Sequence, residues 1–584
     1  MNGRQSSAWW LPVEGFVGVS AALLMTWAAR FVHVDPMVRV GQVSGLAGLQ
    51  LVLLLAMGGT VGLLLLVMRR WPVLPLQFGA AIFAGLSSGV LAAAVSLALR
   101  GTPWPLGGQG GDAGVLQGWA FNIIHGQPID DTYPPLFPHL LGWYTRHFTD
   151  GDPGHALKIV SLVFIALLGP TAYVAWRLIL PPLWALGIGV TASLPLADPY
   201  KPYTTIVLVG LLPVLAKLLQ LIQRSQLLGR RRAAVLGAVV GAVLGLLFLL
   251  YSGWFVWSAA GLVLMGFVLL VRQWRTHGTP ALVTALLLVG SAGAVFVAVS
   301  GFYLTRFLSS AGGAVDRYCY FDVYTEPSYF TMWGGDMPGG LGLGAWPQPG
   351  EIGGVGLFAV VLLVGAAAAL VVGPRNSVVL ATAAAAASAF LMRYWYASHM
   401  WKDQAVMLYP RTNQQLLYCF VVLTGLALFL GVERLLERRH RTVPREHPER
   451  PGRTPRRYAL ASLCALGLLI GMAGSSTGSR YMPEPAARID STGNLAHTAQ
   501  VLRGLNGVCS PYADAAQCVD PVPPAVFDQA AKIRKDQENQ QKPEYRVLSC
   551  QEGGSPYPHA PKPTPTTTKG AGRLETLVEA LVRG

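Results

Sequence analysis

Charge is the scarcest property of this sequence. Only 12% of its 584 residues are Asp, Glu, Lys or Arg, whereas soluble domains carry about 25%. Hydrophobic residues make up 52% of the chain. This composition excludes an ordinary soluble domain and is typical of a protein embedded in a bilayer.

Acidic residues are scarcer than basic ones, with 29 Asp and Glu against 44 Lys and Arg and a net charge of +15. The excess does not indicate a nucleic-acid partner. Most basic clusters lie in short connections between apolar runs and in one linker at 433–457, as the positive-inside rule predicts for membrane proteins. We therefore expect the bilayer, and no nucleic acid, as a partner.

Several familiar catalytic and metal-binding patterns are missing. The six cysteines form no CxxC pair, which argues against a zinc or thiol-redox motif. P-loop, GxSxG and GxGxxG motifs do not occur in a suitable strand–turn–helix context. The sequence therefore gives no reason to expect a metal, a nucleotide or a soluble cofactor.

Long apolar runs are the dominant feature. Each is expected to form a helix across a hydrocarbon core of roughly 30 Å. The fold class expected is an all-α polytopic membrane protein with about thirteen transmembrane helices. Their expected ranges are 9–30, 43–68, 77–99, 156–179, 182–197, 202–223, 233–250, 253–272, 280–300, 353–373, 377–394, 412–433 and 458–475.

Basic connections predict the orientation. With a cytoplasmic N-terminus, the basic segments 69–70, 224–232, 272–275, 375 and 433–457 fall inside, and Arg30 and Arg39 are the exceptions. The membrane domain (1–475) then carries outer loops at 101–155, 301–352 and 395–411. A small extracytoplasmic region (476–584) follows, which we expect to pack loosely on those loops. The short span at 182–197 decides the sidedness of everything after it.

The first outer loop gathers most of the acids. Residues 106–153 contain five aspartates and three histidines between apolar runs. Asp112, in GGQGGDAG, is a candidate general base that takes a proton from a sugar hydroxyl, or else a turn-forming Asp among glycines. Asp130 and Asp131, before Thr-Tyr-Pro-Pro, are candidates for binding acceptor hydroxyls, or for capping and turn formation. This one carboxylate pair offers few oxygen ligands for a metal.

The third outer segment, 393–412, carries cations on the side where the positive-inside rule disfavours them. Arg393, Lys402 and Arg411 are interleaved with aromatic residues such as Tyr394. A lipid phosphate at the interface explains such cations, and snorkelling to ordinary headgroups is the alternative. Lys158, at the start of a span, is expected to join the same phosphate.

Together these features resemble one family. An Asp-bearing loop after the early spans, a D-x-YPP element (131–135), Lys158 and an outer Arg occur in the order seen in actinobacterial galactan arabinofuranosyltransferases, a branch of the GT-C membrane glycosyltransferases. Local matches are GQVSGLAGL (41–49), DPYKPYTTI (198–206) and YSGWFVWSA (251–259). The chain departs from the family in its Gly-Asp112-Ala context and in a shorter tail.

The resemblance implies a GT-C-type bundle and an inverting transfer. The donor would be a polyprenyl-phosphate sugar, in this family decaprenyl-phospho-arabinofuranose, and the acceptor a cell-wall glycan such as galactan. Asp112 would be the base, and Asp131, Asp130, His125 and Tyr133 would support it or bind the acceptor. The donor phosphate and sugar would be bound by outer cations and one aromatic ring, namely Lys158, Arg393, Tyr394, Lys402 and Arg411.

Two other functions compete with this one. Another GT-C enzyme, such as a mannosyltransferase, would share the mechanism and differ in the shape of its pocket. A transporter or flippase for lipid-linked sugars would carry ionisable residues inside its spans and often internal repeats. The spans here hold almost none and no repeat is evident, which favours surface chemistry in the cell membrane.

Overall fold

The computed structural model describes residues 10–68, 74–109, 111–310, 351–352, 355–403, 412–442, 453–483 and 492–501. They are helical apart from turns and one small hairpin, in which β1 (Glu351–Ile352) pairs antiparallel with β2 (Val355–Gly356). The longer helices are α1 Leu11–Ala28, α2 Arg39–Met68, α3 Leu74–Ala98, α4 Gly111–Ile124, α5 Leu136–Phe148, α6 Pro153–Arg177, α9 Pro202–Gln223, α10 Arg230–Leu250, α11 Gly253–Ser310, α12 Leu357–Val372, α13 Ser377–Asp403, α14 Thr412–Thr442, α15 Arg453–Ser479 and α16 Thr492–Val501.

Ten of the described helices are long and apolar enough to cross a membrane. Each of the expected spans coincides with one of these helices, with half of α11, or with a shorter apolar helix at Pro182–Leu196 or Leu357–Val372. The polytopic prediction is therefore confirmed, and the chain is a multi-pass membrane protein by helix length and hydropathy.

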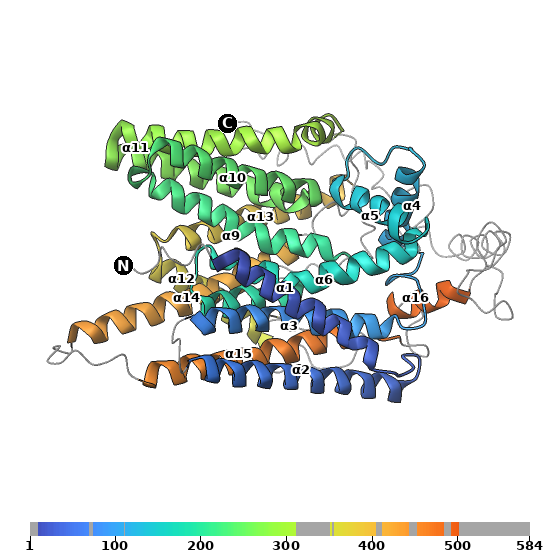
Figure 1. Ribbon diagram of the computed structural model, residues 1–584. Helices are drawn as coiled ribbons and strands as arrows, with labels where there is room; N and C mark the ends of the chain where they lie inside the picture. The colour runs from blue at the N-terminus through green and yellow to red at the C-terminus, as the bar shows by residue number, and fades with distance from the viewer. Residues whose placement is uncertain are drawn as a thin grey trace, which may run out of the picture.

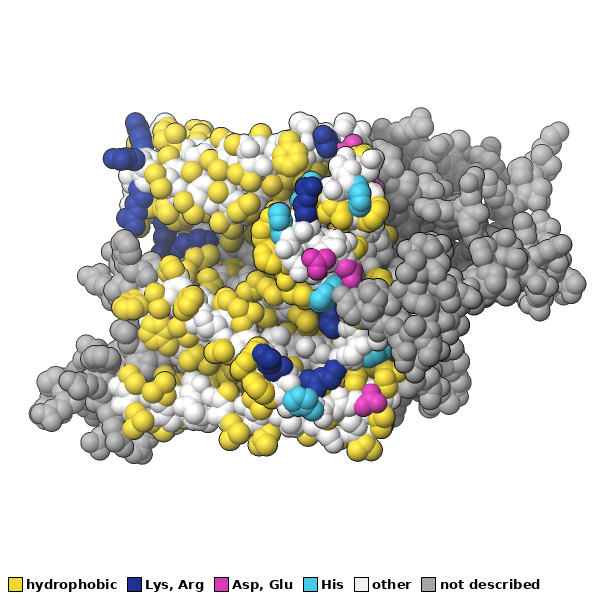
Figure 2. All heavy atoms as spheres, turned by 45° about the vertical axis from the view of Figure 1, so that its right-hand side comes forward, with side chains coloured by type: hydrophobic (Ala, Val, Ile, Leu, Met, Phe, Trp, Pro, Cys, Tyr) yellow, Lys and Arg dark blue, Asp and Glu magenta, His cyan; other side chains and the backbone are white. Residues whose placement is uncertain are grey.

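The long helices lie side by side, and the bundle has two chemically different ends. Figure 1 shows α4, α5 and α16 gathered at one end, which we call the loop end. The other, the arginine end, carries basic residues at helix ends and connections, namely Arg177, Arg224, Arg230, Arg231, Arg232, Arg272, Arg275 and Arg375. In Figure 2 Lys and Arg side chains crowd the left edge, whereas the visible acids lie in the right half.

α3 is the centre of one half of the bundle and is packed by α1, α2, α6 and α15. Small residues let these helices approach closely. A Cβ on Gly85 of α3 would lie 2.1 Å from the Gly18 carbonyl oxygen of α1, and one on Gly169 of α6 would lie 2.0 Å from the Ala84 carbonyl oxygen. Backbone-to-backbone contact thus replaces the large side chains of a soluble core.

The segment Pro182–Leu196 is the least regular crossing. It begins as α7 (Pro182–Trp184), continues as a six-residue π-helix at Ala185–Val190, and ends in a 3₁₀ turn at Leu194–Leu196. α6 starts at the loop end and finishes at Arg177. Because Lys201 contacts Asp112 at the loop end, the chain must cross back between these points. The short span is confirmed as a crossing of the bundle.

α11 makes a second reversal inside what reads as one long helix. Gly278 has φ 73° and ψ −172°, and Pro280 follows it. A positive φ favours glycine, and the proline removes a backbone donor, so the helix breaks here at the arginine end. The two halves correspond to the expected spans 253–272 and 280–300.

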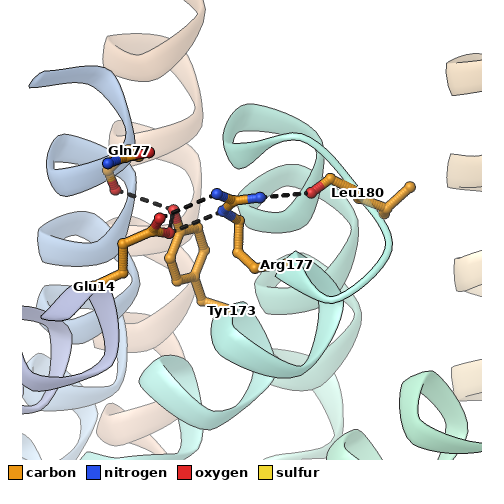
Figure 3. Close-up of polar contacts among 5 residues, drawn as sticks. All are labelled: Glu14, Gln77, Tyr173, Arg177 and Leu180. Atoms are coloured by element: carbon orange, nitrogen blue, oxygen red, sulfur yellow. Dashed lines mark hydrogen bonds and ion pairs between the residues drawn. The ribbon is translucent and has the colours of Figure 1, made fainter. Parts of the chain in front are cut away.

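A buried ion pair joins α1 to α6 and corrects the expectation that the spans hold almost no ionisable groups. Arg177 donates from Nε and Nη2 to the two carboxylate oxygens of Glu14, at 2.9 and 3.0 Å. The Tyr173 hydroxyl lies 2.9 Å from Oε2 of Glu14 and 3.0 Å from the Gln77 carbonyl oxygen of α3 (Figure 3). Glu14 is fully buried, so α1 is held by a satisfied polar cluster.

The described part of the tail packs more tightly than expected. In α16, the Ala496 carbonyl accepts from the Thr102 hydroxyl at 2.9 Å, and His497 Nε2 lies 2.8 Å from the Ala98 carbonyl oxygen. The Gly107 amide donates to the Thr492 carbonyl at 2.8 Å. The expectation of loose packing is wrong for 492–501, because backbone hydrogen bonds fasten it to the connection after α3. Residues 502–584 lie outside the described residues.

We expect Glu14→Ala to destabilise the protein by about 3–5 kcal/mol, because it leaves the Arg177 charge buried without its partner. The double variant Glu14→Leu/Arg177→Met should recover most of this loss. The free energy of unfolding in mixed micelles measures both. Arg231→Ala, an exposed change at the arginine end, is the control and should stay within about 0.5 kcal/mol of the parent. A harmless Glu14→Ala would show that the pair does not hold α1.

Candidate functional site

Asp112 lies in the first turn of α4, at the loop end. The glycines before it allow Tyr200 to approach the backbone. A Cβ on Gly107 would lie 2.5 Å from the Tyr200 ring and one on Gly111 would lie 2.8 Å from its hydroxyl, and both glycines have positive φ values of 82° and 54°. The glycines therefore serve close packing and turn formation, and they leave the carboxylate at the start of a helix, where the dipole favours a negative charge.

Lys201 is the partner of Asp112. Its ammonium contacts Oδ2 of the carboxylate, and the two side chains are 20% and 49% exposed, respectively. Next to this pair, the Ala113 amide donates to the Tyr200 hydroxyl at 3.0 Å. The start of α4 and the connection before α9 are thereby joined. A half-exposed carboxylate held on one oxygen can still meet a ligand from solution.

Asp198 is a second acid in the same connection, and it is buried. Its Oδ1 accepts from the Tyr200 amide at 3.0 Å. Burial raises the pKa of the Asp198 carboxyl, against the opposing effects of this hydrogen bond and of the Lys201 charge. Burial also raises the pKa of the Tyr200 hydroxyl. The DPYK sequence is thus a compact polar turn that presents Lys201 to Asp112.

Asp130 and Asp131 lie in the turn between α4 and α5. Oδ1 of Asp130 accepts from the amide and the hydroxyl of Thr132, both at 2.8 Å, which is the turn-forming role that was the alternative for this residue. Asp131 pairs with Arg306 of α11 at 3.2 Å, and both side chains are more than half exposed. Of this carboxylate pair, Asp131 is the one that faces a cation.

A tyrosine pair connects the two acidic sites. The Tyr133 hydroxyl hydrogen-bonds to the Tyr203 hydroxyl, and Tyr203 is the second residue after Lys201. The Tyr133 ring also packs on Trp119 of α4, with centroids 4.3 Å apart, and the Tyr203 ring stacks on Phe137 at 4.0 Å. Asp112 and the Asp131 turn therefore flank the N-terminus of α9, on one rigid aromatic support.

Lys158 of α6 lies at the loop end but faces the end of α3. Its ammonium donates to the carbonyls of Leu99, at 2.9 Å, and of Thr102. Such contacts satisfy carbonyls that a helix C-terminus leaves open. Lys158 also lines a narrow cavity with Tyr200, between apolar residues of α3 and α6. Its predicted contact with a donor phosphate stays a prediction, with one amine hydrogen remaining for it.

The cations of the third segment are placed only in part. Arg393 of α13 is 1% exposed and donates to the Thr412 hydroxyl at 3.2 Å and to the Asn413 side chain, so it holds the start of α14. Tyr394 is 45% exposed and its ring stacks on Phe390. The Lys402 side chain and Arg411 lie outside the described residues. Binding of a phosphate by these residues stays a prediction.

His125 follows the last residue of α4. Its Nδ1 lies 2.8 Å from the Phe121 carbonyl oxygen, and its ring packs on Phe121. These contacts are with its own helix and not with an acid. Its expected role in supporting the base or the acceptor therefore stays a prediction.

Three site residues were missed from the sequence: Lys201, Asp198 and Arg306. Lys201 had a usable signal, since it is a cation on the side where cations are disfavoured, like Arg393. Asp198 and Lys201 lie in the segment 198–206, which was noted only as a local match. Arg306 had no signal, because its pairing with Asp131 depends on where α11 turns back.

The chain matches no known family model, and no curated protein sequence is significantly similar to it. Its chemistry therefore has to be argued from the site. Within the part of the chain that the structure describes, no group of three His, Cys, Asp or Glu residues could hold a metal ion. The loop end offers carboxylates, cations and aromatic rings, which suit a hydroxyl-bearing ligand with an anionic group.

Replacing Asp198 with Asn should flatten the pH dependence of stability. Because the folded pKa of Asp198 is raised, its contribution is fully present below about pH 3.9, the usual Asp value, and is lost as pH rises through the folded pKa. Asn keeps the acceptor for the Tyr200 amide and cannot ionise.

Unfolding midpoints of both proteins between about pH 4 and pH 7 test this prediction. The stability of Asp198→Asn relative to the parent should increase with pH. Asp150→Asn, at an exposed carboxylate, is the matched control. A difference that is constant, or that grows toward acid, would show that Asp198 is not buried as described.

Proposed function

We propose that the protein is a membrane glycosyltransferase that moves a sugar from a polyprenyl-phosphate donor to a glycan acceptor. The observation that carries this proposal is the Asp112–Lys201 pair at the loop end, with Asp131 and Arg306 on the other side of the Tyr133–Tyr203 contact. Acids and cations from separate connections meet on one face of a membrane bundle. The family resemblance adds arabinofuranose as the sugar and galactan as the acceptor.

The distribution of charge supports an extracytoplasmic site. Basic residues that end helices are concentrated at the arginine end, and the positive-inside rule assigns such an end to the cytoplasm. The loop end, with α4, α5 and α16, then faces outward, where a cell-wall glycan would be available. A GT-C-type arrangement, with a helical bundle below and polar loops above, fits this orientation.

The proposed reaction is a single displacement at the anomeric carbon. An acceptor hydroxyl gives its proton to the Asp112 carboxylate while its oxygen bonds to that carbon, and the bond from carbon to the phosphate oxygen breaks. The configuration inverts and the polyprenyl phosphate leaves with the bonding electrons. Lys201 engages Oδ2 of Asp112, so Oδ1 is the oxygen that takes the proton.

The leaving phosphate needs positive charge nearby. Lys158 is well placed for this, because it lines the narrow apolar cavity beside Tyr200 and lies on the same connection as α16. Lys201 and Arg306 are the other described cations at the acidic face. Asp131, held by Arg306, is suited to bind acceptor hydroxyls, and the Tyr133 and Trp119 rings offer an apolar face to a sugar.

Asp112→Asn should lower transfer by about a hundredfold to ten-thousandfold, the usual contribution of a positioned base. The assay is transfer of labelled sugar from a polyprenyl-phosphate donor to a glycan acceptor in membranes. Asp131→Asn should mainly raise the acceptor KM, because it is proposed to bind and not to take the proton.

Asp150→Asn, at an exposed carboxylate of the same end, is the control and should transfer normally. Full activity in Asp112→Asn with loss in Asp131→Asn would move the base to the second site. Movement of the lipid-linked sugar across the membrane without any glycan product would instead identify a transporter.

A further inference from the structure

A polar pocket at the arginine end lies far from the candidate active site. It is formed where three connections meet: the end of α9, the end of the first half of α11, and the turn between α12 and α13. Its lining residues are Gln223, Leu269, Arg272, Gln273, Thr276, His277 and Arg375. The Gln273 amide donates to the Gln223 carbonyl at 2.6 Å, and Gln223 donates to the Arg375 carbonyl at 3.4 Å. These bonds fix the walls relative to one another.

The pocket is positively charged. Arg272 and Arg375 are both exposed and approach it from different helices, and His277 adds a third nitrogen-bearing side chain. Among the residues described as lining it there is no acid. Two guanidinium groups from different elements are suited to a phosphate, which they bind by paired N–H donors.

One wall also carries an acceptor that lacks a partner. Oε1 of Gln273 is buried and has no hydrogen-bond partner among the described residues. Its identity as oxygen follows from the neighbouring contact, because the atom facing the Gln223 carbonyl must be the NH₂ group. An unsatisfied buried acceptor costs about 1–3 kcal/mol. A ligand that brings a hydroxyl beside the phosphate would relieve this cost.

The surroundings indicate a lipid and not a free anion. Trp274, beside the pocket residues of α11, is 53% exposed, and Val371, at the end of α12, is 77% exposed. Exposed tryptophan near a helix end marks the membrane interface. A phosphate at Arg272 and Arg375 would therefore have acyl chains running along these apolar side chains.

We propose that this pocket binds the headgroup of a phospholipid from the leaflet at the arginine end, with its phosphate between Arg272 and Arg375 and a headgroup hydroxyl toward Gln273. Phosphatidylglycerol has the required chemistry, a single negative charge and two hydroxyl donors. The site does not depend on the glycosyltransferase proposal. It would fix three helix ends of the bundle through one bound lipid.

Native mass spectrometry of the delipidated full chain, titrated with phosphatidylglycerol or phosphatidylcholine, tests the proposal. The parent should prefer phosphatidylglycerol, and Arg272→Gln/Arg375→Gln should weaken its binding about tenfold, the loss of one charge-assisted contact. Arg230→Gln/Arg231→Gln removes the same charge at the same end outside the pocket and should change binding less than about twofold. Gln273→Leu should reduce the preference for phosphatidylglycerol over phosphatidylcholine.

Equal losses in the two double variants would show only general attraction to a basic surface and would overturn the site. Displacement of the lipid by millimolar inorganic phosphate would identify a free anion as the ligand instead. Because these readouts measure binding, an inactive protein in the transfer assay would not affect their outcome.

Discussion

The loop end depends on the short crossing at Pro182–Leu196. Inside a bilayer every backbone N–H and C=O needs a partner, so even a short crossing must be helical. At about 1.5 Å per residue it spans about 22 Å, and α, π and 3₁₀ turns share that length. It packs against α6 and α14, where a Cβ on Gly189 would lie 2.4 Å from the Trp176 ring. Only because it crosses does Lys201 return to Asp112.

Cations in this bundle serve two different purposes. Lys158 and Arg393 satisfy acceptors at helix ends, and Arg177 neutralises a buried carboxylate. Lys201 and Arg306 instead meet partly exposed acids at the loop end. Exposed ion pairs contribute only about 0–1 kcal/mol each, so the second group adds little stability. Its value lies in placing opposite charges where a ligand can reach them.

The sequence predicted the features that depend on local pattern. Apolar runs predict spans because a bilayer core fixes their length, and Asp112 was located correctly at the loop after α3. The Asp112–Lys201 and Glu14–Arg177 pairs could not be predicted, because each joins helices whose neighbours are decided by packing. Arg393 shows the converse limit: an outer cation was read as a phosphate ligand, yet its burial against Asn413 is set by where α14 begins.

The most direct test is the accessibility of single cysteines placed at Asp112, Lys201 and Arg230, measured in intact cells with a membrane-impermeant maleimide and compared with the unsubstituted protein. The account predicts strong labelling at 112 and 201, and labelling at 230 only after the membrane is opened. Labelling of 201 together with 230, but not with 112, would place the DPYK turn at the arginine end and contradict the site.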